Sequence, residues 1–352
     1  MQEAEPEILF ETRGALGLIT LNRPKALNSL THGMCIGMHK ALREWEKDDA
    51  VRAVAIRGLG SRAFCAGGDI RAMAHSSIDK TSAAAEFLRD EYRVNALIGA
   101  FSKPYIALTH GIVMGGGAGV SVHGQIRLAD TDLVFAMPET GIGFVPDIGA
   151  SYFLSRCPGQ TGMYLGLTGA RIGLGDALAL GLMTHSVAAS DHEVIIRRLA
   201  EGDAPEKAVA AVVRASPPPP MREHRALIDL AFAAQSVESV LERLDRDGGI
   251  FATETARVIR SRSPTSLKLA FELVRRGKEL PLSECLNMEY RAGVRTVMGH
   301  DFREGVRALL RDKDGRPRWR PSTLAAVTDE ETKGYFSPLG AFELGIRDNA
   351  DG

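Results

Sequence analysis

The sequence predicts an α/β fold up to about residue 190, followed by a mostly helical region. Short apolar runs typical of strands recur with helix-spaced segments between them as far as Val187, which favours parallel strands joined by right-handed crossovers. After Val187 the strand signals stop, and residues 188–310 are mostly helical in pattern and rich in charge. We therefore expect an α/β core at residues 1–190 and a helical C-terminal region at 191–352.

The first elements are predicted from the spacing of their apolar residues. Ile8–Thr12 and Leu16–Leu21 flank Arg13-Gly14, a pattern typical of a β-hairpin. Residues Thr31–Lys47 carry apolar side chains at helical spacing. Further elements are expected as strands at 54–57, 105–108, 128–129 and 133–136 and as a second long helix at 83–100.

A run of four prolines interrupts the helical region. It follows Ser216 and ends at Pro220. Proline removes a backbone donor and blocks a helix interior, so this run predicts a stiff extended connector.

Composition excludes several classes of protein. The net charge of −1 gives no long-range attraction to nucleic acid or to an anionic membrane, although local cations could still hold a phosphorylated ligand. The acidic segment Met1–Glu5 is neither a signal nor a transit peptide, and the most apolar stretch, 106–122, is interrupted by polar residues. Four cysteines, far apart and without metal-type spacing, are typical of reduced thiols: Cys35, Cys65, Cys157 and Cys285. We expect a cytoplasmic protein without a membrane partner.

Two glycine-rich segments are candidates for binding an oxyanion. Gly115-Gly116-Gly117 ends an apolar run and opens a predicted helix at 118–124, and a second candidate lies at Phe64–Asp69. Glycines leave a main-chain N–H bare at a helix start, where the helix dipole favours negative charge. Two such amides on one carbonyl oxygen would form an oxyanion hole. The alternative is tight packing between a helix and a strand.

Two acids lie downstream, each directly after a proline and among apolar and glycine residues. They are Glu139 and Asp147. Carboxyl groups in apolar surroundings have raised pKa values and can act as base, acid or nucleophile. The alternative is that each acid favours the dipole in the first turn of a helix. A third acid, Glu91, lies on a helix rich in charge, where a solvated face is the simplest interpretation.

The sequence lacks the catalytic motifs of several other enzyme classes. The sequence has no Gly-x-Ser-x-Gly elbow, no His-Glu-x-x-His and no phosphate loop. A dinucleotide fingerprint at 115–119 lacks the acidic residue that should end a following strand.

Taken together, the segments resemble the crotonase (enoyl-CoA hydratase/isomerase) superfamily and, within it, the 3-hydroxyisobutyryl-CoA hydrolase family. The superfamily signatures are the run 21–30 (LNRPKALNSL), the 64–69 loop and the triple glycine. The stretches that resemble the hydrolases are Glu91-Tyr92, 110–114, 121–124, 137–140, 146–149, 152–154, 288–291, 299–307 and 312–314. The resemblance covers nearly the whole chain, with 190–252 the least distinctive part.

The resemblance implies a spiral of ββα units with a helical C-terminal region that binds acyl-CoA. It implies oxyanion amides at Gly68 and Gly116 and a catalytic carboxylate at Glu139. Hydratases keep a second glutamate where this chain has Gly119, so the resemblance does not imply addition of water by two glutamates. Asp147 would supply the replacement carboxylate, as in the hydrolases.

The resemblance also implies contacts with substrate. Glu91 would meet the acyl end and Ala66 would line the site. Arg23 and Lys25 are the local cations that we expect to bind the CoA phosphates, with a solvated turn as the equal alternative.

The implied reaction is hydrolysis of 3-hydroxyisobutyryl-CoA in valine breakdown, with Glu139 as either nucleophile or general base. No metal or redox cofactor is needed for such a reaction. A homo-oligomer is possible, since the superfamily often trimerises. The competing interpretations are an enoyl-CoA hydratase or isomerase and a non-catalytic acyl-CoA-binding protein; a dinucleotide-dependent oxidoreductase ranks below both.

Overall fold

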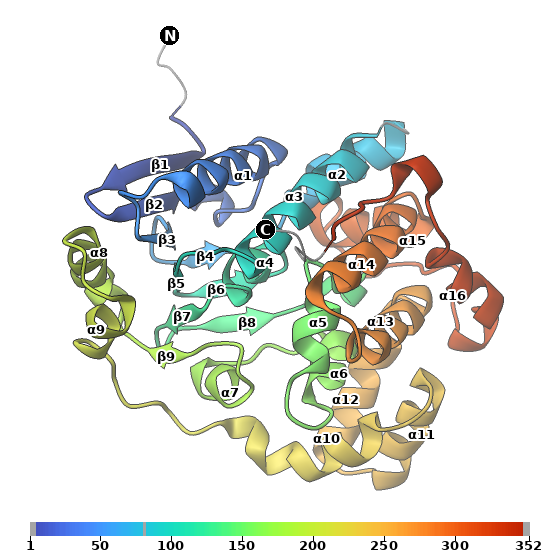
Figure 1. Cartoon of the computed structure of the whole chain (residues 1–352). Coiled ribbons are helices and arrows are strands. Elements are labelled where there is room, and N and C mark those ends of the chain that lie inside the picture. Colours follow the sequence, from blue (N-terminus) through green and yellow to red (C-terminus); the bar gives the residue numbers. More distant parts are fainter. Residues whose placement is uncertain (1–4, 80–81, 348–352) are drawn as a thin grey trace. The chain divides into compact units, whose positions relative to one another are not determined.

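The computed structural model describes residues 5–79 and 82–347 (Figure 1). The chain folds into two compact units, each built from three stretches of sequence. Unit 1 comprises residues 1–68, 93–135 and 171–220, and unit 2 comprises 69–92, 136–170 and 221–352. Because the units alternate along the chain, the main chain passes from one to the other five times. The boundary that we drew at residue 190 stays a prediction.

Unit 1 is built on a six-stranded sheet. Its strand order is β1-β2-β3-β5-β7-β9, in which β1 and β2 form the predicted antiparallel hairpin and the other neighbours are parallel. The strands are β1 (Ile8–Arg13), β2 (Leu16–Leu21), β3 (Ala53–Gly58), β5 (Tyr105–Leu108), β7 (Ile126–Ala129) and β9 (His185–Ser186).

Side chains alternate between the two faces of β2. Leu16 and Leu18 pack in one apolar core with Ile195 and Leu199 of α8 (His192–Ala200), and Val209 of α9 (Pro205–Ala210) joins the same core. On the other face, a Cβ on Gly17 would lie 2.6 Å from the Trp45 ring of α1 (His32–Lys47), so α1 covers that face. Helices on both faces are what a parallel sheet requires, since both faces must be buried.

A second, three-stranded sheet has the order β4-β6-β8. Its members are β4 (Ala63–Cys65), β6 (Ile112–Met114) and β8 (Val134–Ala136). Short helices complete unit 1: α4 (Gly116–Val122) follows β6, and α7 (Leu174–Ala179) precedes β9. Beyond Ser186, the described residues contain no further strand, as the sequence pattern predicts.

Unit 2 is helical. Val145 lies in a core with Leu269 of α13 (Pro264–Gly277), Met288 and Ala292 of α14 (Leu282–Val297) and Phe336, directly after α16 (Asp329–Tyr335). The other helices of the unit are α2 (Ile70–Asp79), the first part of α3 (Ala83–Gly99), α5 (Ala150–Ser155), α6 (Thr161–Thr168), α10 (Arg225–Phe232), α11 (Val237–Asp247), α12 (Ile250–Arg260) and α15 (His300–Val306).

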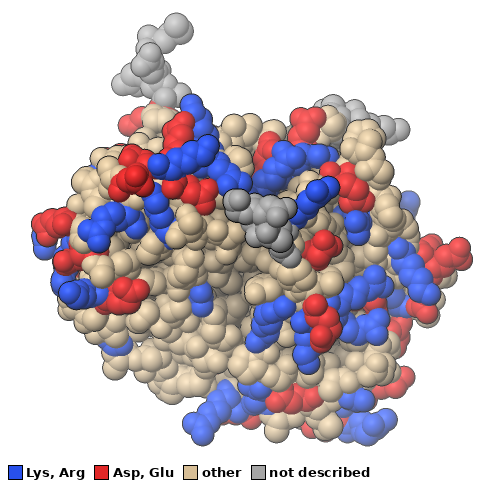
Figure 2. Space-filling view, viewed as in Figure 1, with Lys and Arg blue, Asp and Glu red and all other residues tan. Residues whose placement is uncertain are grey.

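The proline run lies outside any helix as far as Pro219, as predicted, but not at Pro220. Residues 214–219 have no helix, and unit 1 ends at Pro220, where a short 3₁₀ turn begins (Pro220–His224). On the face drawn in Figure 2, acidic and basic side chains are intermixed, which agrees with the near-zero net charge.

Candidate active site

The two glycine-rich segments of unit 1 lie against each other. A Cβ placed on Gly67 would lie 3.9 Å from the Gly116 nitrogen and 3.5 Å from the Met114 oxygen, and one on Gly117 would lie 2.2 Å from the Cys65 oxygen. Gly67 has φ +118° and Gly115 has φ +47°, backbone conformations that glycine adopts without strain. Close packing, the alternative that we left open, therefore accounts for part of the glycine pattern.

The packing leaves amides bare next to this contact. Within residues 5–79 and 82–347, neither the Gly68 N–H nor the Gly116 N–H has a hydrogen-bond acceptor. Gly116 is the first residue of α4, where helix geometry supplies no acceptor. The helix begins at Gly116, two residues before the predicted Ala118.

Residues 22–30 hold the 64–69 loop from the other side. Leu30 N–H donates to the Gly67 oxygen at 2.8 Å, and Ala66 N–H donates to the Leu27 oxygen at 3.0 Å. Asn28 Nδ2 donates to the carbonyl oxygens of Leu59 and Ala63 at 2.9 and 3.0 Å. The conspicuous 21–30 motif thus has a structural task, which is to fix the backbone of the candidate oxyanion loop.

The two candidate phosphate cations differ in the structure. The Arg23 guanidinium donates to the Ser29 carbonyl at 2.6 Å and pairs with Glu7 at 3.0 Å, so it stabilises the same turn. Lys25 is exposed, and its ammonium group has no partner among the described residues. Of the two, Lys25 is the one whose charge remains available to a ligand.

Among the described residues, five acids of unit 2 are buried, and four of them interact through their charges. Glu91 comes from α3, Glu139 begins a 3₁₀ turn (Glu139–Ile142), Asp147 precedes α5 and Glu289 comes from α14. Among the described residues, Glu91 Oε1 and Glu139 Oε2 are buried without a hydrogen-bond partner. A buried acceptor without a partner is costly, so these atoms mark a place where water or a ligand would be stabilised.

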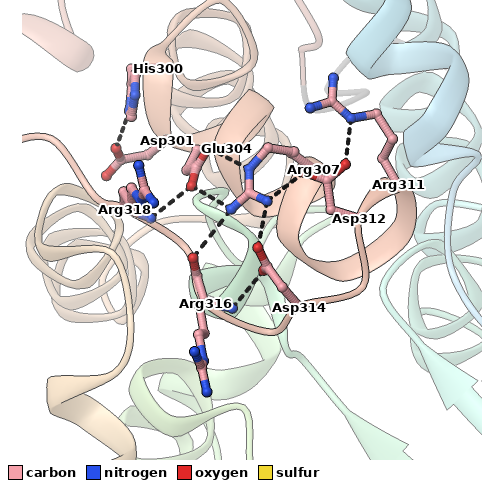
Figure 3. A network of polar contacts seen from close by, with 9 residues as sticks. All are labelled: His300, Asp301, Glu304, Arg307, Arg311, Asp312, Asp314, Arg316 and Arg318. Carbon is pink, nitrogen blue, oxygen red and sulfur yellow. Dashed lines mark hydrogen bonds and ion pairs between the residues drawn. The ribbon is translucent and has the colours of Figure 1, made fainter.

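Helix α15 fixes the backbone that carries Glu139. A Cβ on Gly305 would lie 2.2 Å from the Ile142 oxygen, so α15 contacts the 139–142 turn directly. Figure 3 shows what holds α15 itself: Arg307 pairs with Glu304, Asp312 and Asp314 at 2.7–2.8 Å. This network fastens the helix to the segment that follows it.

Asp147 lies in an unusual turn. Ile148 has φ +57° and Gly149 has φ +86°, so two successive residues are left-handed. Tyr92 Oη donates to Asp147 Oδ2 at 2.7 Å. The Glu289 carboxylate accepts from Gly149 N–H at 2.6 Å and Ser151 N–H at 2.7 Å. Two residues from distant helices therefore hold the carboxylate and the turn that carries it.

Burial raises the pKa of all four acids, and the Asp147 charge raises the pKa of the other three further. Burial raises the pKa of Asp147 to about 7, against the opposing effect of the Tyr92 hydrogen bond. Burial and the Asp147 charge raise the pKa values of Glu91 and Glu139 well above their usual range. Burial raises the pKa of Glu289 to about 8, although hydrogen bonds from Ser151 and Gly149 act in the other direction. Acids with pKa values of about 7 and 8, as for Asp147 and Glu289, can take up or release protons near neutral pH.

One interpretation of the sequence is wrong, and two residues were missed. Glu91 is only 3% exposed, so it is not on a solvated face. Tyr92 and Glu289 contributed to the family resemblance but received no role. The signal for Glu289 was available: it lies at helical spacing with Cys285 and Ala292 on the buried side of α14, where a charged residue needs an explanation.

Comparison with known proteins places the chain in a family. The enoyl-CoA hydratase/isomerase family profile matches residues 16–336. The chain belongs to the enoyl-CoA hydratase/isomerase family. Among curated relatives, the mitochondrial 3-hydroxyisobutyryl-CoA hydrolase of Danio rerio is 44% identical over 97% of this chain and 92% of its own length. The Homo sapiens protein of the same name is 42% identical, over 97% and 91%.

Solved structures confirm the crotonase fold. A chain titled carnitinyl-CoA dehydratase from Mycobacterium thermoresistibile aligns with a TM-score of 0.92 at 42% identity, covering 96% of this chain and 98% of that one. An enoyl-CoA hydratase from Rhodobacter sphaeroides aligns at 0.91 with 37% identity, covering 97% and 100%. The names within this family thus include both hydrolases and lyases.

The structure and the comparisons also bear on the expected location of the protein and on metal binding. No helix in the described part of the chain is long and apolar enough to span a bilayer. The names of the hydrolase relatives place those proteins in mitochondria, so the cytoplasmic expectation is not confirmed. Within the described ranges, no three His, Cys, Asp or Glu side chains could hold a metal ion together.

Proposed function

We propose that this protein hydrolyses a short β-hydroxyacyl-CoA thioester, 3-hydroxyisobutyryl-CoA, to the free acid and CoA. The observation that carries the proposal is Gly119, in the buried helix α4, where hydratases of the superfamily would carry a second glutamate. The acids Glu139 and Asp147 are both present, buried and raised in pKa. Relatives named for this hydrolase, at 42–44% identity over nearly the whole chain, support the same reaction.

The proposal gives each candidate residue a task. The Gly68 and Gly116 amides would stabilise the negative charge that develops on the thioester oxygen. Glu139 would act on the carbonyl carbon, and Asp147 would hold the water or the acyl hydroxyl group. Glu91 would bind the acyl end.

Two routes use Glu139 differently. As a nucleophile, its oxygen adds to the carbonyl carbon, the C–S bond breaks, CoA leaves as thiolate and water hydrolyses the acyl–glutamyl anhydride. As a general base, it takes a proton from water, whose oxygen adds to the carbonyl before the C–S bond breaks. Rapid-quench mass spectrometry of the protein separates the routes, because only the first leaves an acyl group on Glu139.

Neither route needs a metal or a redox cofactor, and we propose that none is required. Activity should therefore survive dialysis against a chelator. We propose Lys25 and Ala66 as further contacts for the CoA part of the substrate. A homo-oligomer stays a proposal that light scattering would test.

The deciding experiment measures two reactions with one acyl-CoA panel. Thiol release from 3-hydroxyisobutyryl-CoA and 3-hydroxypropionyl-CoA reports hydrolysis, whereas loss of the unsaturated thioester of crotonyl-CoA reports hydration. We expect thiol release, which Glu139→Gln lowers at least about a hundredfold, and little hydration. The 42% identity to a chain titled carnitinyl-CoA dehydratase favours a lyase as second candidate. Formation of an unsaturated thioester from carnitinyl-CoA, without thiol release, would establish that alternative.

A further inference from the structure

The Asp147 carboxylate lies in a turn with a strained backbone, which its surroundings must stabilise. Ile148 is β-branched, and a left-handed conformation is a clear outlier for such a residue (φ +57°). Strained backbone of this kind persists only where the surroundings over-determine it, and it concentrates at functional sites. Within unit 2, the groups that determine this turn can be identified.

The first group is the Glu289 carboxylate, which is 0% exposed. One oxygen accepts from Gly149 N–H at 2.6 Å, and the other accepts from Ser151 N–H at 2.7 Å and Ser151 Oγ at 2.5 Å. These amides open helix α5, so a carboxylate here also favours the helix dipole. Glu289 therefore fixes the residues that directly follow Asp147 and Ile148.

The second group is the Tyr92 hydroxyl. It donates to Asp147 Oδ2 at 2.7 Å, and its ring packs edge-on against Tyr290, with centroids 6.1 Å apart. Tyr290 neighbours Glu289 on α14, and its own hydroxyl accepts from Arg89 and donates to the Ala85 oxygen. Adjacent residues of α14 thus support both the turn and the tyrosine that binds Asp147.

We infer that Tyr92 and Glu289 are positioning residues that fix the orientation and the protonation of Asp147. The inference rests on the proposed function insofar as Asp147 takes part in the reaction. Tyr92 donates to one oxygen of the Asp147 carboxylate, Oδ2. The titratable groups that face Asp147 are Tyr92 and Glu91 from α3, Glu139 from its 3₁₀ turn and Glu289 from α14.

The direction of the effect follows from the hydrogen bond. A donor to a carboxylate stabilises the charged form, so the Tyr92 hydroxyl lowers the pKa of Asp147. Removing it should raise the pKa of the Asp147 carboxyl by about one unit. In the pH profile of kcat/KM, the apparent pKa that reports the ionisation of Asp147 should rise by the same amount. This holds whether the active form of Asp147 is the anion or the protonated acid.

The test compares Tyr92→Phe with Tyr290→Phe. Each variant removes one phenolic hydroxyl from the same aromatic pair and keeps both rings, but only the first removes a donor to Asp147. In Tyr92→Phe we expect the pH limb of thiol release to move upward by about one unit and kcat/KM at neutral pH to fall about tenfold. In Tyr290→Phe we expect the wild-type profile.

A second measurement needs no turnover. In the full-length protein with ¹³C-labelled aspartate, the Asp147 carboxyl signal, assigned by its loss in Asp147→Asn, should titrate at higher pH in Tyr92→Phe only. An unchanged titration in Tyr92→Phe, or an equal shift in both variants, would overturn the role of Tyr92. A shifted titration in a protein that releases no thiol would keep this role and reject the proposed hydrolysis.

Glu289 is tested by its effect on the turn. Glu289→Gln keeps one carbonyl oxygen as an acceptor but replaces the second oxygen by an amide NH2 group, which cannot accept, so hydrogen exchange at Gly149 and Ser151 should become faster. We expect kcat to fall with KM little changed, because the turn positions Asp147 and not the CoA moiety. If exchange at these amides stays at the wild-type rate, or if KM rises in proportion to the loss of kcat, the positioning role of Glu289 is wrong.

Discussion

Replacing Asp147 by Asn should make the protein more stable while making it less active. Asp147 is buried, and its pKa rises from the ordinary 3.8 to about 7. Asn has nearly the same shape, and its carbonyl oxygen can still accept from Tyr92. The substitution therefore removes an ionisable group from an apolar site without leaving a cavity.

The sign and size follow from linkage between protonation and folding. A carboxyl whose pKa is higher in the folded state favours folding less as pH rises, because the unfolded chain loses its proton first. Below the unfolded pKa the two proteins should be similarly stable. Above about pH 7 Asp147 is ionised, and the wild type loses the full free energy of burying this charge. The loss is about 4 kcal/mol, because one pKa unit corresponds to 1.36 kcal/mol. Between about pH 5 and pH 8, the advantage of the variant should grow by roughly 2–3 kcal/mol.

Thermal unfolding of both proteins at these two pH values measures the effect. The variant should gain several degrees in Tm over the wild type at the higher pH, and clearly less at the lower pH. Asp49→Asn is the matched control, since that carboxylate is exposed in a turn. A Tm difference that does not change with pH, or a variant less stable than the wild type at about pH 8, would refute the reasoning.

Three further predictions follow from the same structure. Glu139→Gln should lower thiol release at least about a hundredfold, because it removes the proposed primary catalytic group. The Tm of this variant at alkaline pH should not fall. If the variant keeps near-full activity, Glu139 takes no part in the reaction. Gly117→Ala should lower Tm and abolish activity, because its Cβ would lie 2.2 Å from a backbone oxygen. Gly33→Ala, on an open helix face, should instead stabilise the protein by about 0.5–1 kcal/mol. Equal Tm changes in the two variants would contradict the role of close packing at Gly117. Arg23→Ala should lower Tm, whereas Lys25→Ala should raise KM for acyl-CoA at unchanged Tm; the reverse pattern would show that Arg23, not Lys25, serves the ligand.

Most elements were predictable from the sequence, including the three-residue strand β8 within the expected 133–136, and the exceptions were short. The strand at Leu16–Leu21 has the predicted bounds, and α1 begins one residue after the predicted Thr31, which caps it with its side chain. Both have enough residues to show an apolar period. The strands β4 and β6 have three residues each, too few for any period, and neither was predicted.

Candidate site residues were predictable only where their immediate sequence neighbours indicate a chemical role. Glu139 and Asp147 follow prolines in apolar surroundings, and their burial and raised pKa agree with that signal. The partner that holds the Asp147 turn, Glu289, lies 140 residues from Gly149. No local pattern reports such a pairing. Glu91 was misjudged for a related reason: its charged neighbours on α3 lie on other faces of the same helix.

The alternation of the two units along the chain has a consequence during biosynthesis. Domains generally fold as units, the N-terminal one first, while the chain is still being made. All three stretches of unit 1 have been translated by residue 220, but the third stretch of unit 2 begins only at residue 221. The segments that carry Glu91, Glu139 and Asp147 are therefore translated long before Glu289. A nascent chain halted at residue 220 would expose their apolar neighbours to water and should be a substrate for chaperones or proteases.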